Sequence, residues 1–316
     1  MAQLLLLYKA MKMQKTVNKI IEFSGIGMHT GRDISARVLP SGEDTGITFV
    51  RSDIHSAVAI KAEPSNVVAT SYATSLGKDG VTVSTVEHLM AAFYGLGVDN
   101  AVVELDGPEV PIMDGSSAHF IEMIEAAGLR ELDSPRRYLV VKRPIKVVDR
   151  DKYILLMPAV CGELSIDYSI DFAHSLLQSQ SYSGRFSSDV FREEMGMART
   201  FGFLKDVEML RANGLARGGS LDNAIVIGDT GVLNEDGLRY PDEFVRHKVL
   251  DMMGDISILG VPVIGRLVAH RSGHSLNHKL VKEIMRRPTR WEITDTLPCK
   301  DIAPASPVLM EKMASF

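Results

Sequence analysis

The sequence predicts an α+β protein with two domains, each of which layers helices on a sheet. Segments that alternate polar and apolar residues, typical of strands, and segments with one apolar helical face occur in both halves of the 316-residue chain. The length agrees with two domains of roughly 150 residues each. A polar segment with a proline, residues 131–137, is the predicted boundary between them.

The first half is expected to alternate short strands and helices. A helix is predicted from Ser84, because apolar residues share one face as far as Phe93 and glycines follow, including Gly97. A second helix is predicted at residues 119–127, ended by Gly128. Strands are predicted where branched and aromatic residues lie between Gly, Pro and Asp, at residues 20–23, 34–39, 47–51 and 101–105.

The second half repeats this mixture. A strand is predicted at residues 138–141, directly after the polar segment. Residues 164–172 alternate strictly between apolar and polar side chains, which is typical of a strand with one wet face. Long helical patterns follow at residues 245–259 and 277–286. Both halves therefore contain the parts of an α+β domain.

Composition limits the classes of protein that the chain can belong to. The net charge of −5 does not indicate a nucleic-acid-binding protein. The cysteines, Cys161 and Cys299, form no Cys-x-x-Cys pair, so we expect a reducing compartment and neither a disulfide framework nor a cysteine zinc site. No segment reaches about 18 uninterrupted apolar residues, so the sequence predicts a soluble, cytoplasmic protein without stable membrane insertion. Residues 1–12 are interpreted as an N-terminal extension.

Ser84, Glu87 and His88 stand at the start of the first predicted helix. Ser84-x-x-Glu87 fits a capping box, in which Glu87 reaches back to the Ser84 amide. Alternatively, the adjacent pair places a metal ligand, His88, beside a general base, Glu87. Taken alone, the pattern favours the cap.

His247 and Asp251 are four residues apart in the helix predicted at residues 245–259. Positions i and i+4 lie one above the other on a helix, so both side chains can reach one zinc ion. The alternative is an exposed His–Asp pair. Val249 and Leu250 indicate that much of the helix is buried, and buried polar pairs usually have partners or metals. The two interpretations are therefore evenly balanced.

His274 follows Gly273 in a segment expected to be a loop. A loop histidine near a metal suits general acid catalysis, because its pKa lies near neutrality. A histidine on a surface loop is the alternative, and this motif alone favours it.

The three motifs together contain the parts of a hydrolytic zinc site. Catalytic zinc commonly has three protein ligands and one water, and His88, His247 and Asp251 supply two imidazoles and a carboxylate. A free glutamate can take the proton of that water, and a second titrating group can protonate a leaving amine. The chain lacks His-Glu-x-x-His, so it does not have the standard zincin motif.

A segment rich in glycine, from Gly25 to Gly31, is not a phosphate-binding loop. It lacks the Lys-Ser/Thr ending of such loops, and no long helix follows it. We interpret it as a turn between strands that brings His29 near the site.

The ordered set of motifs resembles the UDP-3-O-acyl-N-acetylglucosamine deacetylase family, which carries out the committed step of lipid A synthesis in Gram-negative bacteria. The resemblance covers residues from about 15 to about 305. It rests on Gly25-Ile-Gly-Met-His-Thr-Gly31, Ser84-Thr-Val-Glu-His-Leu-Met90, Pro111-Ile-Met-Asp-Gly-Ser116, Ala198-Arg-Thr-Phe-Gly-Phe203, Gly218-Gly-Ser-Leu-Asp-Asn223, Arg246-His-Lys-Val-Leu-Asp251 and Gly273-His274.

The resemblance implies one zinc ion per chain and a role for each of ten side chains. The zinc ligands would be His88, His247 and Asp251. The residues that act on the reacting atoms would be Glu87 as general base, His274 as general acid, Asp255 holding His274 charged, and Thr200 as a hydrogen-bond donor to the tetrahedral intermediate. The substrate contacts would be Lys248, Lys152 and Phe203.

The resemblance also implies an architecture of two similar two-layer α/β sandwich domains, packed helix to helix with the active site between them. The expected division is domain I at residues 13–133, a linker at 134–137, domain II at 138–308 and a tail at 309–316. A β-α-β insert at about 200–229 would form a hydrophobic passage for the acyl chain. Its suggested lining residues, which are alternatively core residues of a small helix, are Leu204, Met209, Leu210, Leu215 and Ala216.

The reaction implied is hydrolysis of the 2-acetamido group of UDP-3-O-(3-hydroxyacyl)-N-acetylglucosamine by a monomeric enzyme, giving acetate and a free amine. The alternatives are a zinc amidohydrolase that acts on another acylated sugar nucleotide and a binding module with a structural zinc. Activity on a substrate without the 3-O-acyl chain would favour the first. Unfolding on metal removal would favour the second.

Overall fold

The computed structural model describes residues 11–55, 58–159, 162–172, 177 and 179–297. Residues 1–10 of the expected extension, the expected tail at 309–316 and both cysteines lie outside these ranges. The described part is an α+β fold, as the sequence predicts.

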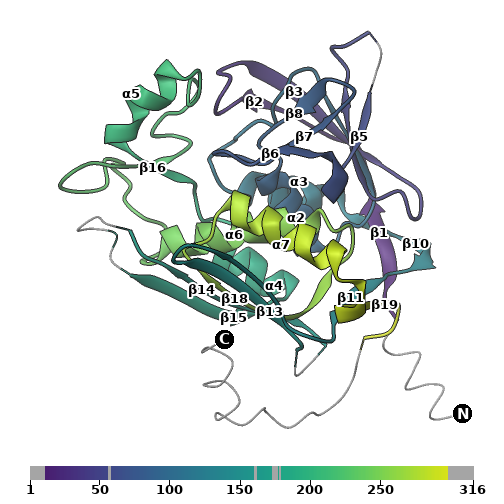
Figure 1. The fold of residues 1–316 in the computed structure, drawn as a ribbon. Helices are drawn as coiled ribbons and strands as arrows, with labels where there is room; N and C mark the ends of the chain where they lie inside the picture. Colours follow the sequence, from purple (N-terminus) through teal and green to yellow (C-terminus); the bar gives the residue numbers. More distant parts are fainter. Residues whose placement is uncertain (1–10, 56–57, 160–161, 173–176, 178, 298–316) are drawn as a thin grey trace, which may run out of the picture.

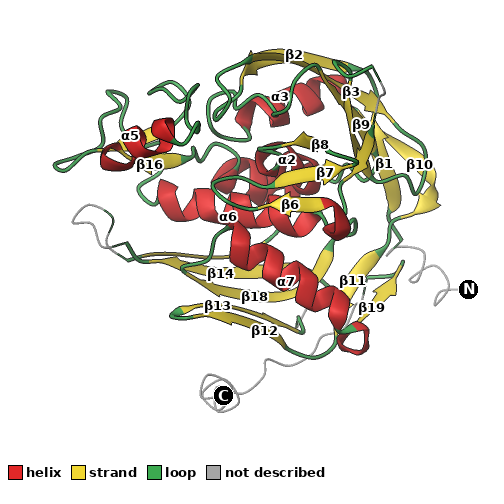
Figure 2. Cartoon of the chain, turned by 45° about the horizontal axis from the view of Figure 1, so that its top comes forward, coloured by secondary structure: helices red, strands yellow, loops and turns green. Residues whose placement is uncertain are grey.

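Helices lie between two sheets, so that the order across the molecule is sheet, helices, helices, sheet (Figure 2). The helices are α2 (Glu87–Leu96), α3 (Ala118–Ala127), α4 (Ser188–Val190), α5 (Leu204–Ala212), α6 (Glu243–Ser257) and α7 (His274–Arg286). Helices α2 and α3 cover the first sheet, α6 and α7 cover the second, and α2 packs directly against α6. The place where the two helical layers meet is therefore the crossing of α2 and α6.

The first sheet has five strands in the order β2-β3-β9-β4-β5. Their bounds are β2 (Ile21–Ile26), β3 (Asp33–Pro40), β9 (Ala101–Leu105), β4 (Ile47–Arg51) and β5 (Ala59–Lys61). β9 pairs antiparallel with β3 and parallel with β4. The strands predicted in this half are confirmed, although β2 runs three residues further than expected, to Ile26.

The second sheet has seven strands, with β12-β13-β18-β11-β19 in order and β14 paired with β15 and β18. Their bounds are β11 (Tyr138–Val141), β12 (Ile145–Asp149), β13 (Lys152–Met157), β14 (Leu164–Ile170), β15 (Gln180–Arg185), β18 (Val263–His270) and β19 (Trp291–Thr294). The strict alternation predicted for β14 is confirmed, because Leu164, Ile166, Tyr168 and Ile170 are buried and the residues between them are half-buried.

Two helix starts differ from the prediction. Helix α2 begins at Glu87, and its N-cap Val86 makes no capping bond through its side chain. The Ser84 hydroxyl instead donates to the carbonyl of Pro108, so the capping box is wrong. Helix α7 begins at His274, so the predicted loop histidine is the first residue of a helix.

Three smaller units complete the fold (Figure 1). β1 (Met13–Val17) pairs with β10 (Leu129–Pro135), so most of the polar boundary segment is a strand, while the division into domains stays a prediction. β6 (Val67–Ala69), β7 (Ser75–Lys78) and β8 (Val81–Val83) form a second small sheet. In the third unit, β16 (Phe201–Phe203) and β17 (Ile225–Ile227) pair in parallel around α5, in the region where a β-α-β insert is expected.

One continuous cluster of buried apolar side chains joins both helical layers and both sheets. It includes Leu89 and Phe93 from α2 and Val249, Leu250 and Met253 from α6. The core therefore holds the crossing of α2 and α6 in place without any bound group. Within the described ranges, every helix is too short or too polar to cross a membrane.

Candidate metal centre

His88, His247 and Asp251 meet where α2 crosses α6. The Nε2 atoms of His88 and His247 lie 3.5 and 3.3 Å from Asp251 Oδ1, and one ligand atom from each residue falls within 4.8 Å of the others. All three side chains are buried. The structure thus brings together the three predicted ligands from opposite layers of the fold.

Two features of the sequence produce this meeting. On α6, His247 and Asp251 are one turn apart and share a face, as their spacing predicts. Across the helices, a Cβ atom at Gly254 would lie 2.1 Å from the carbonyl oxygen of Glu87. Glycine at 254 therefore lets the two backbones touch, which brings His88 within reach of Asp251.

The residues present fit a divalent metal ion. Asp251 Oδ1 and His88 Nδ1 are buried and have no hydrogen-bond partner among the described residues. A buried carboxylate oxygen without a donor is costly, so an oxygen that faces two imidazole nitrogens calls for a cation. Two imidazoles and one carboxylate are a ligand set that zinc commonly uses at catalytic sites.

The contacts around the ligands set their charge and orientation. His247 Nδ1 donates to the carbonyl of Ala198 at 3.0 Å, which directs Nε2 toward Asp251 Oδ1. Lys248 Nζ binds the second oxygen of Asp251 at 2.7 Å. Burial raises the pKa of Asp251, but His247, Lys248 and His274 outweigh it and hold the pKa well below its usual range.

Glu87 lies next to the cluster and keeps one carboxylate oxygen available. Its Oε2 accepts the backbone N–H of Thr74 at 3.0 Å, while Oε1 lies 3.8 Å from His274 Nε2. Burial raises the pKa of Glu87 to about 7, against the opposing charge of His274. A carboxylate with a pKa near neutrality is suited to accept a proton from water.

His274 faces Glu87 from the first turn of α7. Its Nδ1 lies 2.8 Å from Asp255 Oδ2, and its Nε2 lies 3.8 Å from both Glu87 Oε1 and Asp251 Oδ2. Burial opposes the charged imidazole, but Asp255, Asp251 and Glu87 together raise the pKa of His274 to about 10. The ring is therefore a charged donor with its Nε2–H directed into the site.

Asp255 is held by donors from two segments, the one that contains Thr74 and helix α7. Thr74 Oγ1 donates to its Oδ1 at 2.6 Å, and Asn277 Nδ2 donates to its Oδ2 at 2.8 Å, beside His274. These contacts fix the carboxylate that holds His274 charged. The roles of Thr74 and Asn277 are not predicted from the sequence, because neither residue belongs to a motif with a spacing of its own.

A cavity of about 530 Å³ opens from the cluster. Its polar end carries Glu87, His88, Thr200, Lys248, Asp251 and His274, and its other end is lined mainly by apolar side chains of the β16-α5-β17 unit and the segment that follows, including Phe203, Leu204, Val207, Leu210, Val226 and Leu233. The predicted residues His88, His247, Asp251, Glu87, His274, Asp255, Thr200, Lys248 and Phe203 thus lie at or beside one site.

Some residues that the sequence suggests as substrate or passage contacts do not line the cavity. Lys152 is the exposed first residue of β13 and is not among the residues that line the cavity. Leu204, Leu210 and Ala216 line it, whereas Met209 is 45% exposed and neither it nor Leu215 is a lining residue. None of the residues of α5 is buried, so the alternative that they form the core of a small helix is wrong.

The turn from Gly25 to Gly31 adds His29 to the cavity wall. It joins β2 to β3, as predicted. The buried carboxylate of Glu109 accepts the backbone N–H groups of His29 and Thr30, each at 2.9 Å. Glu109 therefore fixes the turn against the site.

Comparisons with known proteins identify the family of the chain. The model of the UDP-3-O-acyl N-acetylglycosamine deacetylase family matches residues 14–286. The chain belongs to this family. It is 52% identical over 280 residues to the UDP-3-O-acyl-N-acetylglucosamine deacetylase of Myxococcus xanthus (strain DK1622), a match that covers 89% of this chain and 88% of the relative.

Two further members of the deacetylase family match over nearly their whole length. The relative from Geobacter sp. (strain M21) is 50% identical over 285 residues, which cover 90% of this chain and 93% of that protein. The relative from Geotalea uraniireducens (strain Rf4) is 43% identical over 304 residues, which cover 96% and 98%. Both carry the name UDP-3-O-acyl-N-acetylglucosamine deacetylase.

Proposed function

We propose that this deacetylase hydrolyses the N-acetyl group of UDP-3-O-(3-hydroxyacyl)-N-acetylglucosamine to acetate and a free amine, the committed step of lipid A biosynthesis. The observation that carries the proposal is the convergence of three ligand side chains with Glu87 and His274 at the polar end of a largely apolar cavity. The names of the relatives support the substrate class.

His88, His247 and Asp251 would hold one zinc ion. When bound, zinc supplies a Lewis acid that polarises the amide carbonyl and lowers the pKa of water toward about 7. Since all three ligands come from one chain, the site needs no second copy. We therefore propose that the enzyme acts as a monomer. We also propose that it acts in the cytoplasm, without insertion into a membrane.

Glu87 acts as the general base in this proposal. Its Oε1 takes a proton from water as the water oxygen attacks the acetyl carbon, and its Oε2 stays bound to the Thr74 amide. The Thr200 hydroxyl, which lines the cavity beside the cluster, donates a hydrogen bond to the developing oxyanion.

His274 completes the reaction as the general acid. Its Nε2–H transfers a proton to the sugar nitrogen as the carbon–nitrogen bond breaks, and Asp255 stabilises the imidazolium before that transfer. Acetate and the free amine leave. The acetic acid formed gives up its remaining proton to the amine or to solvent, and the proton that Glu87 has gained passes to His274, directly or through water, which restores both residues.

The cavity supports a place for each part of the substrate. The apolar end is suited to the 3-O-acyl chain, with Phe203, Leu204 and Leu210 along it. Lys248 lies at the polar end, where its charge suits the anionic sugar nucleotide. A contact of Lys152 with the nucleotide stays a prediction, because that residue is exposed on β13.

Metal analysis together with a deacetylase assay tests the proposal. Wild-type protein is expected to bind one zinc ion per chain and to release acetate, and His247→Ala to lose both. His119→Ala is a matched control, because His119 is an exposed histidine on α3. A His247→Ala protein that retained its zinc and its turnover would contradict the proposal.

A further inference from the structure

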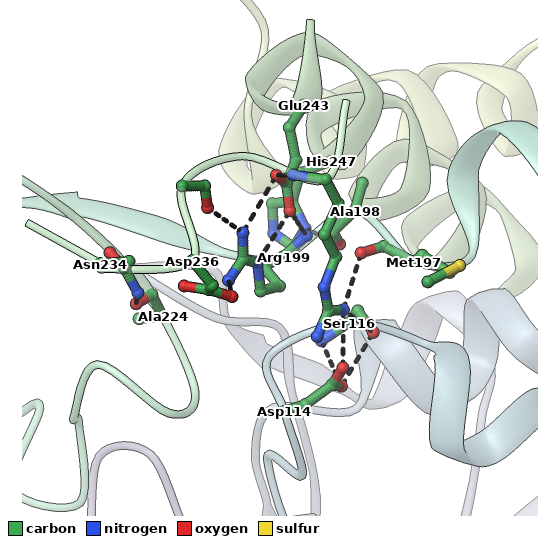
Figure 3. Close-up of polar contacts among 12 residues, drawn as sticks. Asp114, Ser116, Met197, Ala198, Arg199, Ala224, Asn234, Asp236, Glu243 and His247 are labelled. Atoms are coloured by element: carbon green, nitrogen blue, oxygen red, sulfur yellow. Dashed lines mark hydrogen bonds and ion pairs between the residues drawn. The ribbon is translucent and has the colours of Figure 1, made fainter. Parts of the chain in front are cut away.

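Residues 196–200 form a strap between the two helical layers. The backbone at its two ends is bound from the loop at 114–117, and the backbone at its middle is bound from α6 or the segment before it. Ser117 N–H donates to the Gly196 carbonyl, and Thr200 N–H donates to the Gly115 carbonyl at 2.7 Å. The strap includes Ala198, whose carbonyl orients His247 (Figure 3).

The next residue of the strap, Arg199, makes a buried ion pair with Glu243. Arg199 Nε and Arg199 N–H both donate to Glu243 Oε1, at 2.9 and 3.0 Å. Arg199 is 3% exposed and Glu243 is fully buried. The Glu243 charge depends on this pair, because removal of Arg199 would leave a buried carboxylate without its ion-pair partner.

Glu243 also binds the backbone of the segment before α6. Its Oε2 accepts the backbone N–H of Arg239 at 2.6 Å. The Arg239 side chain then donates to Asp114 Oδ2 at 2.7 Å and to the Met197 carbonyl at 3.0 Å (Figure 3). Glu243 thus ties the strap to a loop of the first half of the chain.

The position of Glu243 on α6 connects this network with the metal centre. Glu243 and His247 are four residues apart, so they lie on the same face of the helix, one turn from each other. Each binds one of two consecutive residues of the strap: Glu243 binds Arg199, and His247 binds the Ala198 carbonyl. The distance between the two anchor points is fixed by the helix itself.

We propose that the Arg199–Glu243 ion pair positions the metal ligand His247 by holding the Ala198 carbonyl against His247 Nδ1. The proposal rests on the function proposed above, in which His247 binds the metal. Neither Arg199 nor Glu243 is among the residues that line the cavity, so both are positioning residues that act through the strap. A role in stability alone would leave the affinity of the folded protein for metal unchanged.

The test measures zinc affinity in the folded protein by competition with a chromogenic chelator. In Glu243→Gln, the amide presents an N–H₂ group to the N–H donors of Arg199 or Arg239, so the strap shifts. We expect the Kd for zinc to rise about 10- to 100-fold, the range seen when a partner of a metal-bound histidine is lost. The visible absorption band of the cobalt-loaded protein should change as well.

Asp236→Asn is the matched control. It changes the other carboxylate that binds Arg199, but that carboxylate is 66% exposed and the Glu243 contacts remain. Its zinc Kd and cobalt spectrum are expected to match the wild type. A second variant, Arg199→Met with Glu243→Leu, removes both charges and so avoids an unpaired buried charge if Glu243→Gln fails to fold.

The outcomes separate this inference from the proposed function. If the His247→Ala variant binds zinc as tightly as the wild type does, the proposed function itself is wrong. If His247→Ala abolishes binding while folded Glu243→Gln and the double variant keep the wild-type Kd, only the positioning role is wrong. If neither variant folds, the pair is a general folding element and the positioning proposal is rejected.

Discussion

Helices α5 and α6 both border the cavity, yet their surroundings differ greatly. Every residue of α6 except Arg246 and Lys248 is buried, and the helix carries His247, Asp251 and Asp255. No residue of α5 is buried, and it contributes apolar side chains such as Leu210. The proposed chemistry is thus built on a helix that is almost wholly buried, and the apolar end of the cavity on a helix with no buried residue. Precise geometry is needed where bonds break, and a loose fit suffices where an acyl chain binds.

Removal of the metal should have the largest effect on activity. It should also show that the metal centre needs the ion for catalysis and not for folding. Chelation is expected to abolish deacetylation, while the far-UV circular dichroism stays unchanged, because the apolar core spans both layers independently of the ligands. Zinc should restore the activity. Loss of the fold on chelation would instead indicate a structural metal.

Replacement of the proposed base gives the next largest effect. Glu87→Gln is expected to lower kcat by about 10²- to 10⁴-fold, the usual contribution of general base catalysis. The zinc content should stay at one per chain, which separates this role from ligation. Glu122→Gln, an exposed carboxylate on α3, is the control and should be fully active.

The pH dependence of deacetylase activity should be bell-shaped, and Asp255→Asn should narrow the active pH range. Activity requires ionised Glu87, so it rises with pH, and requires charged His274, so it falls at alkaline pH. The two limbs reflect the pKa of Glu87, which burial raises to about 7, and that of His274, which the nearby carboxylates raise to about 10, and a bound cation would lower both pKa values. Asp255→Asn removes the strongest charge that raises the His274 pKa, so the alkaline limb should move to lower pH.

A smaller loss of kcat should accompany the shift of the alkaline limb in Asp255→Asn. The kcat of Asp255→Asn is expected to fall about 10- to 100-fold, because Asp255 acts through the orientation and charge of His274. Asp149→Asn, an exposed acceptor on β12 that binds Lys279, is the control for loss of a carboxylate. An alkaline limb that did not move in Asp255→Asn would remove this role for Asp255.

Changes in α5 should give the smallest effect and should depend on the substrate. Leu210→Ala is expected to lower kcat/KM about tenfold for the acylated substrate, because it removes methylene contacts worth about 0.8 kcal/mol each. For an analogue with a much shorter acyl chain, Leu210→Ala should lower kcat/KM far less. Met209→Ala is the neighbouring control, since Met209 is exposed and does not line the cavity.

Two predictions that rest on local spacing are reproduced by the structure. His247 and Asp251 share a face because one helical turn separates them, and β14 alternates because its two faces differ in burial. His88 reaches them only because α2 touches α6 at Gly254, and no local pattern contains that contact. The capping box failed for the same reason, since Glu87 binds the amide of Thr74, 13 residues away.

Other parts of the site have no local signature at all. Thr74 and Asn277 converge on Asp255 from positions 181 and 22 residues away in the sequence, so only the fold brings them together. Gly273 favours a tight turn and so predicts a loop at His274, but helix α7 begins at this residue. His274 and Asn277 of that turn instead face the buried carboxylate of Asp255.

The close contact at Gly254 has a consequence for the design of such centres. To graft His88, His247 and Asp251 onto another pair of helices, copying the ligands and their spacing would not be enough. The new scaffold must also let one backbone rest on the other, since a Cβ at this position would lie 2.1 Å from a carbonyl oxygen. Such a design would therefore first require a glycine at the position that corresponds to Gly254.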